Sequence, residues 1–154
     1  MGNSFEFKSN FAKRILATLI DYAICYAFCY LYVIYIGDDD GRGGKSVNGL
    51  LALVVLLIWF AYFVIVEAMY GATLAHKVLG LKVLTLKRNE IEFKHAFKRR
   101  LLDIIDIYFY GIPALIAIKH SSTHQRLGDM WAGTIVVDTK DPEQFLKVQD
   151  EANG

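Results

Sequence analysis

Residues 14–36 of the chain read RILATLIDYAICYAFCYLYVIYI, an apolar and aromatic run whose only carboxylate is Asp21. A helix needs about 20 apolar residues to cross a bilayer, so this run is long enough to span one. Arg14 precedes Asp21 by seven residues, close to two helical turns, and both ionisable side chains therefore share one helix face. A carboxylate at the centre of such a helix costs about 2.5–3.5 kcal/mol, so we expect Asp21 to have a partner, a proton or a function.

A second apolar run, residues 50–66 extended to Tyr70, predicts a second spanning helix antiparallel to the first. The 154 residues are 55% hydrophobic and only 21% charged, which is typical of a small membrane protein. The first helix lacks the small-residue cleavage site of a signal peptide, so we interpret it as an anchor. A net charge of +1 without a basic, aromatic-interleaved stripe argues against nucleic-acid binding.

The distribution of basic residues predicts an orientation. Residues 71–100 hold eight Lys or Arg against two acids, and Lys13 and Arg14 precede the first helix. We therefore expect this segment and the amino end to be cytoplasmic, with the Asp- and Gly-rich residues 37–45 forming a flexible loop on the other side. The carboxyl end is expected to be cytoplasmic as well, because residues 134–138 are expected to pair as a strand with residues 81–86 of this segment. Cys25 and Cys29, four residues apart on the first helix, are interpreted as packing residues.

Two short segments have the character of strands. Residues 81–86 alternate in polarity after a predicted short helix, residues 73–79, that ends at Gly80, and residues 134–138 are rich in β-branched side chains. Short strands gain little alone, so we expect them to pair as a small two-stranded β element on the cytoplasmic side.

The segment from residue 101 to residue 118 is apolar but carries Asp103 and Asp106 and is broken at residues 111–113, Gly-Ile-Pro. If this segment crossed the membrane fully, the strand at residues 134–138 would lie on the opposite side of the membrane from its partner at 81–86. We therefore favour a broken segment that is re-entrant or interfacial, with a third span as the alternative. The predicted fold class is an all-α membrane protein: a transmembrane helical hairpin, this third helical segment and the small β element.

Several acids fall in or beside apolar segments and are candidates for binding an ion or a proton: Asp21, Glu67, Asp103, Asp106 and Asp129. On a helix beginning near residue 93, Arg99, Asp103, Asp106 and Tyr110 share one polar face. Arg99 and Asp103 form either a plain helical ion pair or part of a polar cavity with Asp21, in which carboxylates share a proton or hold a cation. Glu67 either snorkels to the membrane surface or joins the same cluster.

Other chemistry is not indicated. His120 and His124 have chelating spacing only on a helix, and the Ser-Ser-Thr between them predicts a loop, so we expect no metal site. Because no nucleophile, base or nucleotide-binding loop stands in a suitable context, we expect neither an enzyme nor a cofactor.

Four blocks resemble the RDD family of small bacterial membrane proteins, which is named for one arginine and two aspartates. The blocks are Arg14 to Asp21; Glu67 with residues 71–74 and 79–83; Arg99 and Arg100; and residues 126–137, RLGDMWAGTIVV, which contain Asp129. The likeness covers residues 8–139 as one transmembrane domain, followed by a polar cytoplasmic tail at 140–154. One block departs from the family, which has Gly-Lys where Ala75-His76 stands here, and Lys77 points about 100° away from that position.

The resemblance implies a multi-pass protein of the bacterial inner membrane with a transport-related role, and sodium/proton exchange is suggested for some members. The leading hypothesis is a transporter in which Asp21 and Asp129 bind a cation or proton, with Arg14, Arg99 and Arg126 as charge partners. Two or three spans are few for a carrier, so such a chain would form a homo-oligomer. The alternative is an accessory or assembly protein whose Arg and Asp residues lock helices and whose basic face binds anionic lipid; a membrane enzyme ranks last.

Overall fold

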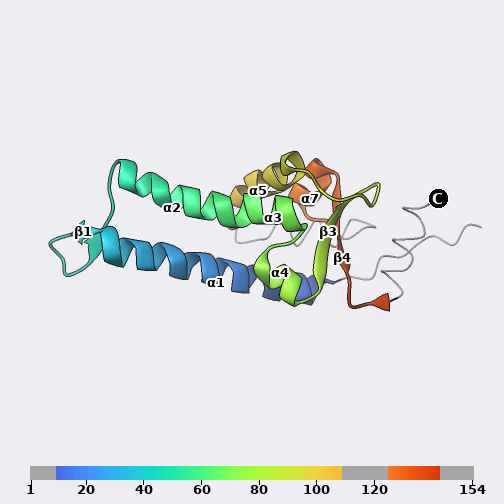
Figure 1. Cartoon of the computed structure of the whole chain (residues 1–154), viewed down its shortest axis with the longest axis horizontal. Coiled ribbons are helices and arrows are strands. Elements are labelled where there is room, and N and C mark those ends of the chain that lie inside the picture. The colour runs from blue at the N-terminus through green and yellow to red at the C-terminus, as the bar shows by residue number, and fades with distance from the viewer. Residues whose placement is uncertain (1–9, 109–124, 143–154) are drawn as a thin grey trace, which may run out of the picture.

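The computed structural model describes residues 10–108 and 125–142, and the side chains of residues 104–108 are outside this description. The first apolar run forms one helix, α1 (Phe11–Ile36). The second run is continuous as α2 (Leu50–Phe60), the π-helical turn η1 (Ala61–Ile65) and α3 (Val66–Tyr70). These two rods lie antiparallel and side by side, so the predicted helical hairpin is confirmed (Figure 1).

The loop between the two rods is more ordered than the sequence suggested. Strands β1 (Asp38–Asp39) and β2 (Lys45–Ser46) pair antiparallel at the tip of the hairpin. One carboxylate oxygen of Asp40 accepts the backbone N–H groups of Arg42 at 2.8 Å and Gly44 at 2.9 Å. This side chain closes the turn by replacing backbone hydrogen bonds, a known property of aspartate that composition alone did not locate.

At the opposite end, the chain turns back through Gly71, whose φ of 66° is left-handed, and α4 (Leu74–Val78) packs onto α1. Strand β3 (Leu81–Thr85) then pairs antiparallel with β4 (Thr134–Asp138), with Leu81 opposite Asp138 and Thr85 opposite Thr134. The predicted two-stranded element is therefore confirmed, and β3 ends one residue earlier than expected.

Between these strands lie α5 (Phe93–Tyr108) and α7 (Leu127–Ala132), which pack against each other and against η1 and α3. Their contact is close at Gly128, where an added Cβ would come within 2.7 Å of the Arg99 carbonyl oxygen. A small apolar core of Val64, Val83, Ile91 and Ala96 joins the second rod, β3 and α5. The break expected at 111–113, and with it the choice between a re-entrant segment and a third span, lies outside the described residues.

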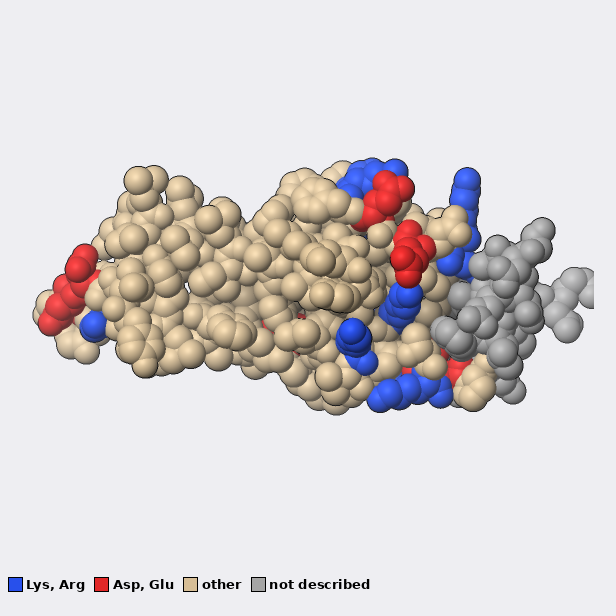
Figure 2. Space-filling view, in the orientation of Figure 1, with Lys and Arg blue, Asp and Glu red and all other residues tan. Residues whose placement is uncertain are grey.

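The surface separates into charged ends and an uncharged middle. Figure 2 shows basic and acidic side chains at the two ends of the long axis and a wide band without them between. Among the described residues, the helices 11–36 and 50–78 are long and apolar enough to cross a membrane. Only 11% and 22% of their most apolar stretches are buried within the protein, whereas the core helix of a soluble protein is mostly buried. The two helices are thus candidate spans with apolar outer surfaces.

Candidate ion-binding site

Six buried or nearly buried side chains form a closed ring of alternating charge at the β3–β4 end of the helices. Its carboxylates are Glu67 of α3, Asp103 of α5 and Asp129 of α7, and its guanidinium groups are Arg99 and Arg100 of α5 and Arg126 at the start of α7. Each carboxylate contacts two arginines, and each arginine contacts two carboxylates. We call this set the arginine–carboxylate ring.

Ion-pair distances define the ring. Arg99 places Nε 2.7 Å from Glu67 Oε1 and Nη1 2.5 Å from Asp129 Oδ1. Arg100 also pairs with Glu67, and its Nη1 lies 2.6 Å from Asp103 Oδ2. Arg126 closes the ring with longer contacts, 3.6 Å from Nη1 to Asp103 and 3.9 Å from Nε to Asp129. Because the pairs join α3, α5 and α7, the ring fixes the position of these helices relative to one another.

Arg14 adds the first helix to this ring. Its guanidinium forms a buried salt bridge with Asp129, which also accepts the backbone N–H of Arg126 at 3.0 Å and so caps the first turn of α7. Burial alone would raise the pKa of Asp129, but the positive charges of Arg99 and Arg14 outweigh it and hold the pKa well below its ordinary value. Asp129 is therefore a permanently charged anchor at neutral pH.

Asp21 occupies a separate environment, about 10 Å farther along α1 than Arg14. Its fully buried carboxylate accepts hydrogen bonds from Tyr62 Oη at 2.7 Å, Thr73 Oγ1 at 2.5 Å and the Ala75 backbone N–H at 3.0 Å. His76 Nδ1 lies 2.9 Å from Asp21 Oδ2. The carboxylate thus binds the unsatisfied N-terminus of α4 as well as three side chains, and its ionisable partner is a histidine rather than an arginine.

The π-helical turn η1 lies between the two environments. It presents Tyr62 to Asp21 on one side, and on the other the Phe63 carbonyl oxygen accepts Arg100 Nε at 3.3 Å. The Phe63 ring also lies 4.8 Å from the Arg100 guanidinium carbon. Wide turns of this kind are rare within α-helices and occur frequently at functional sites, so η1 adds to the reasons for treating this region as a candidate site.

The structure tests several expectations from the sequence. Arg14 and Asp129 come together as expected, whereas Asp21 contacts neither of them and instead binds partners from the second rod and α4. Of the two alternatives for Glu67, snorkelling is wrong, because the side chain is 1% exposed; it lies in a buried cluster, although its partners there are Arg99 and Arg100 and not Asp21. Asp103 pairs with Arg100 and Arg126, so a pair with Arg99 is also wrong; Arg99 is drawn across to Glu67 and Asp129. The Asp106 side chain, Tyr110, His120 and His124 lie outside the described residues.

Four side chains that contact the candidate site residues were not among the residues proposed for the site: Tyr62, Thr73, His76 and Arg100. Thr73 and Arg100 stand in blocks that resemble the RDD family, which was the available signal for them. The only signal for His76 was its place in the block that departs from the RDD pattern. Tyr62 stands in an ordinary apolar run, and nothing in the spacing of Tyr62 or Thr73 relates them to Asp21, which is 41 or 52 positions earlier.

These features define a small helical protein with two candidate spans, held together at one end by buried ion pairs. The RDD family model matches residues 8–133, so the chain belongs to the RDD family. No curated protein and no solved structure was found to match the chain.

Proposed function

We propose that this protein is a multi-pass protein of the bacterial inner membrane with a transport-related role, in which Asp21 exchanges a proton or a monovalent cation. The single observation that carries the proposal is the Asp21–His76 contact at 2.9 Å. Of the other buried carboxylates of the described helices, Glu67 and Asp103 each pair with two arginines and Asp129 pairs with three. Arginine stays charged at any physiological pH. A histidine, unlike an arginine, can be either neutral or protonated, so the charge balance around Asp21 can change.

The geometry supports a division of labour between the two environments. The arginine–carboxylate ring holds the helices in place, since breaking a buried ion pair is costly. Asp21 lies deeper in the uncharged band, among oxygen atoms of Tyr62 and Thr73. Carboxylate and hydroxyl oxygens suit hard cations, and a competing proton would be taken up by the carboxylate or by His76.

The test is cation-dependent proton flux in vesicles reconstituted with the purified protein. A pH-sensitive dye inside the vesicles reports proton movement after a sodium or potassium pulse. We expect flux with the wild-type protein, none with Asp21→Asn, and wild-type flux with Asp39→Asn, which changes an exposed carboxylate at the far end of the hairpin. Absence of cation-dependent flux in the wild-type protein, with correct insertion, would exclude exchange.

A second candidate function is that of a membrane accessory or assembly protein. The observation favouring it is the arginine–carboxylate ring. Together with Arg14, the ring joins α1, α3, α5 and α7 through ion pairs, and this structural role requires no transported ion. Under this proposal the vesicles show no flux, Asp21 serves only to cap α4, and a defined partner copurifies at fixed stoichiometry. For transport, two spans would require a homo-oligomer, which the mass of the detergent-solubilised protein would reveal.

A further inference from the structure

An apolar ridge runs along the outer side of α5 and α7, facing away from the arginine–carboxylate ring. Its side chains, each between 38% and 52% exposed, are Phe93, Phe97 and Leu101 of α5 and Leu127, Met130 and Trp131 of α7. On α5 they follow a spacing of four residues, while the buried Ala96, Arg99 and Arg100 point inward. Contiguous exposed apolar side chains of this size mark an interaction surface. We call this surface the α5–α7 ridge.

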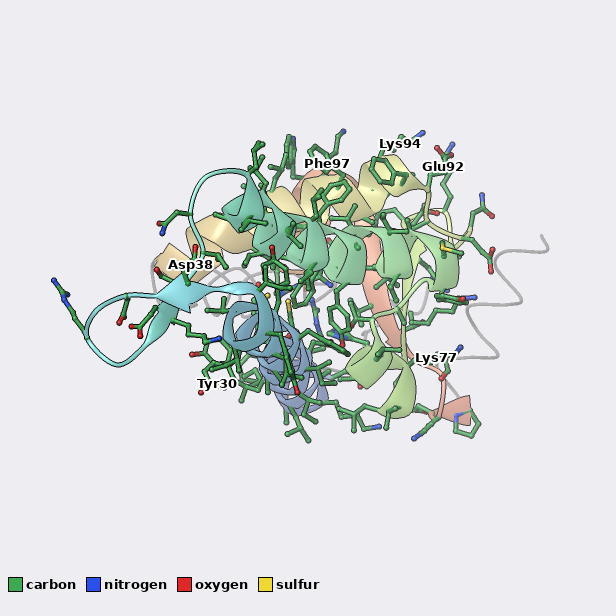
Figure 3. All side chains as sticks on the ribbon, turned by 60° about the vertical axis from the view of Figure 1, so that its left-hand side comes forward. Tyr30, Asp38, Lys77, Glu92, Lys94 and Phe97 are labelled. Carbon is green, nitrogen blue, oxygen red and sulfur yellow. The ribbon has the colours of Figure 1, made fainter. Side chains whose placement is uncertain are left out.

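The ridge is continuous with the outer surface of the second candidate span. The Phe60 ring of α2 lies 6.1 Å from that of Phe93 and 6.2 Å from that of Phe97, both edge-on. Figure 3 shows Phe97 projecting outward from α5, with Lys94 and Glu92 beyond it toward the charged end. Whatever covers the exposed outer face of α2 therefore extends onto the ridge, and for a candidate span that environment is lipid.

Lysines border the ridge at the charged end. Lys94 is paired with Glu92 at 2.9 Å, and Lys98, one turn farther along α5, places its ammonium group 5.6 Å from the centre of the Trp131 ring. On α4, the ammonium group of Lys77 likewise lies 5.0 Å from the centre of the Tyr70 ring. Tryptophan and tyrosine concentrate at the headgroup level of membranes, and lysines beside them extend their ammonium groups to the interface.

We propose that the α5–α7 ridge is embedded in the lipid leaflet next to the β3–β4 sheet, and that Lys98 with Trp131 binds the phosphate of an anionic phospholipid headgroup there. Lys98 supplies the positive charge, and the Trp131 indole holds the ammonium group at headgroup depth. The inference rests on the proposed membrane location but not on transport, and it concerns a surface on the opposite side of α5 from the ring.

Trp131 itself provides the readout. The chain has two tryptophans, so Trp59→Phe leaves Trp131 as the only one. This variant is reconstituted in bilayers containing a small fraction of brominated lipid, either anionic or zwitterionic, and the quenching of Trp131 gives the relative binding constant of the two lipids. We expect quenching by both, with preference for the anionic lipid. Lys98→Gln should reduce that preference about five-fold, the equivalent of roughly 1 kcal/mol for one basic residue.

Two further variants separate the explanations. Lys98→Arg should keep the preference, because it keeps the charge, and Lys45→Gln on β2, at the other end of the protein, should leave it unchanged. Circular dichroism of each variant checks folding. The proposal is overturned if Trp131 is not quenched by either lipid, which would mean that protein covers the ridge. It is equally overturned if the two lipids quench alike, or if Lys45→Gln lowers the preference as much as Lys98→Gln does.

Discussion

His76 Nδ1 lies 2.9 Å from Oδ2 of Asp21, and both side chains are buried between α1 and α4. The two residues are 55 positions apart, and their contact closes α4 onto the first helix. Its chemical consequence is that the ionisable partner of Asp21 is a histidine, which, unlike arginine, can be either neutral or protonated.

Asp21→Asn should leave a folded, inserted protein that has lost cation-dependent proton flux. The asparagine oxygen can still accept hydrogen bonds from Tyr62 and from the Ala75 N–H. Its NH2 group can donate to Thr73 and to neutral His76, provided that these two residues act as acceptors instead of donors. Thermal unfolding in detergent, measured beside flux, checks both parts. Loss of stability and insertion together would identify Asp21 as a structural lock and favour the accessory function.

Arg14→Ala should damage folding more than Asp21→Asn does. The substitution removes one of the arginines that compensate the buried charge of Asp129, and loss of one partner of a buried pair costs roughly 3–5 kcal/mol. The adjacent Lys13→Ala is the matched control: Lys13 pairs with Asp138, but its side chain is 46% exposed, so we expect a loss of at most about 1 kcal/mol. Equal losses of unfolding free energy in the two variants would contradict the role of Arg14.

Gly128→Ala should destabilise the protein by about 1–3 kcal/mol through overpacking. The new methyl group would lie 2.7 Å from the Arg99 carbonyl oxygen, so α5 and α7 would have to separate and stretch the Arg99–Asp129 contact. Leu127→Ala, at the neighbouring exposed position, should have a much smaller effect in detergent. The midpoint of thermal unfolding distinguishes the two variants, and an unchanged midpoint for Gly128→Ala would show that the helices can move apart freely.

Acid should weaken the protein partly through Asp129. The folded-state pKa of Asp129 lies below its ordinary value of 3.8, so its ion pairs contribute fully above about pH 4 and are lost as the pH falls through the folded-state value. Unfolding free energies measured from roughly pH 5 down to pH 2 should therefore fall less steeply for Asp129→Asn than for the wild-type protein. Asp39→Asn, which alters an exposed carboxylate, should retain the wild-type slope. Parallel slopes for all three would indicate that Asp129 does not titrate in this range.

Topology offers a prediction independent of activity. A reporter fused after Gly154 should be active only in its cytoplasmic form, while a cysteine introduced at Gly43, in the β1–β2 hairpin, should react with a membrane-impermeant maleimide added outside the cell. The physical reasons are the excess of basic residues in residues 71–100 and the pairing of β4 with β3, which keeps the C-terminal strand at the same end. A fusion that reports a periplasmic carboxyl end would reverse the proposed orientation.

The sequence by itself determined the local elements. Residues 14–36 and 50–70 could only be long apolar helices, and the alternating and β-branched residues of β3 and β4 predicted strands that had to pair, because each pattern depends on neighbouring residues. The seven-residue spacing of Arg14 and Asp21 likewise placed both charges on one face. These properties follow from helix and strand periodicity and need no knowledge of the rest of the chain.

Only the tertiary structure decided which charges meet. The partners of Asp21 are 41 to 55 residues away in the sequence. Glu67 pairs with Arg99 and Arg100 of α5, although local spacing on that helix suggested Asp103 as a partner for Arg99. The π-helical turn that orients Tyr62 was equally hidden, because an unbroken apolar run is compatible with either helix type. Ion pairs between distant segments depend on how the helices pack. A single sequence shows which residues are charged, but it does not show which of them the packing brings into contact.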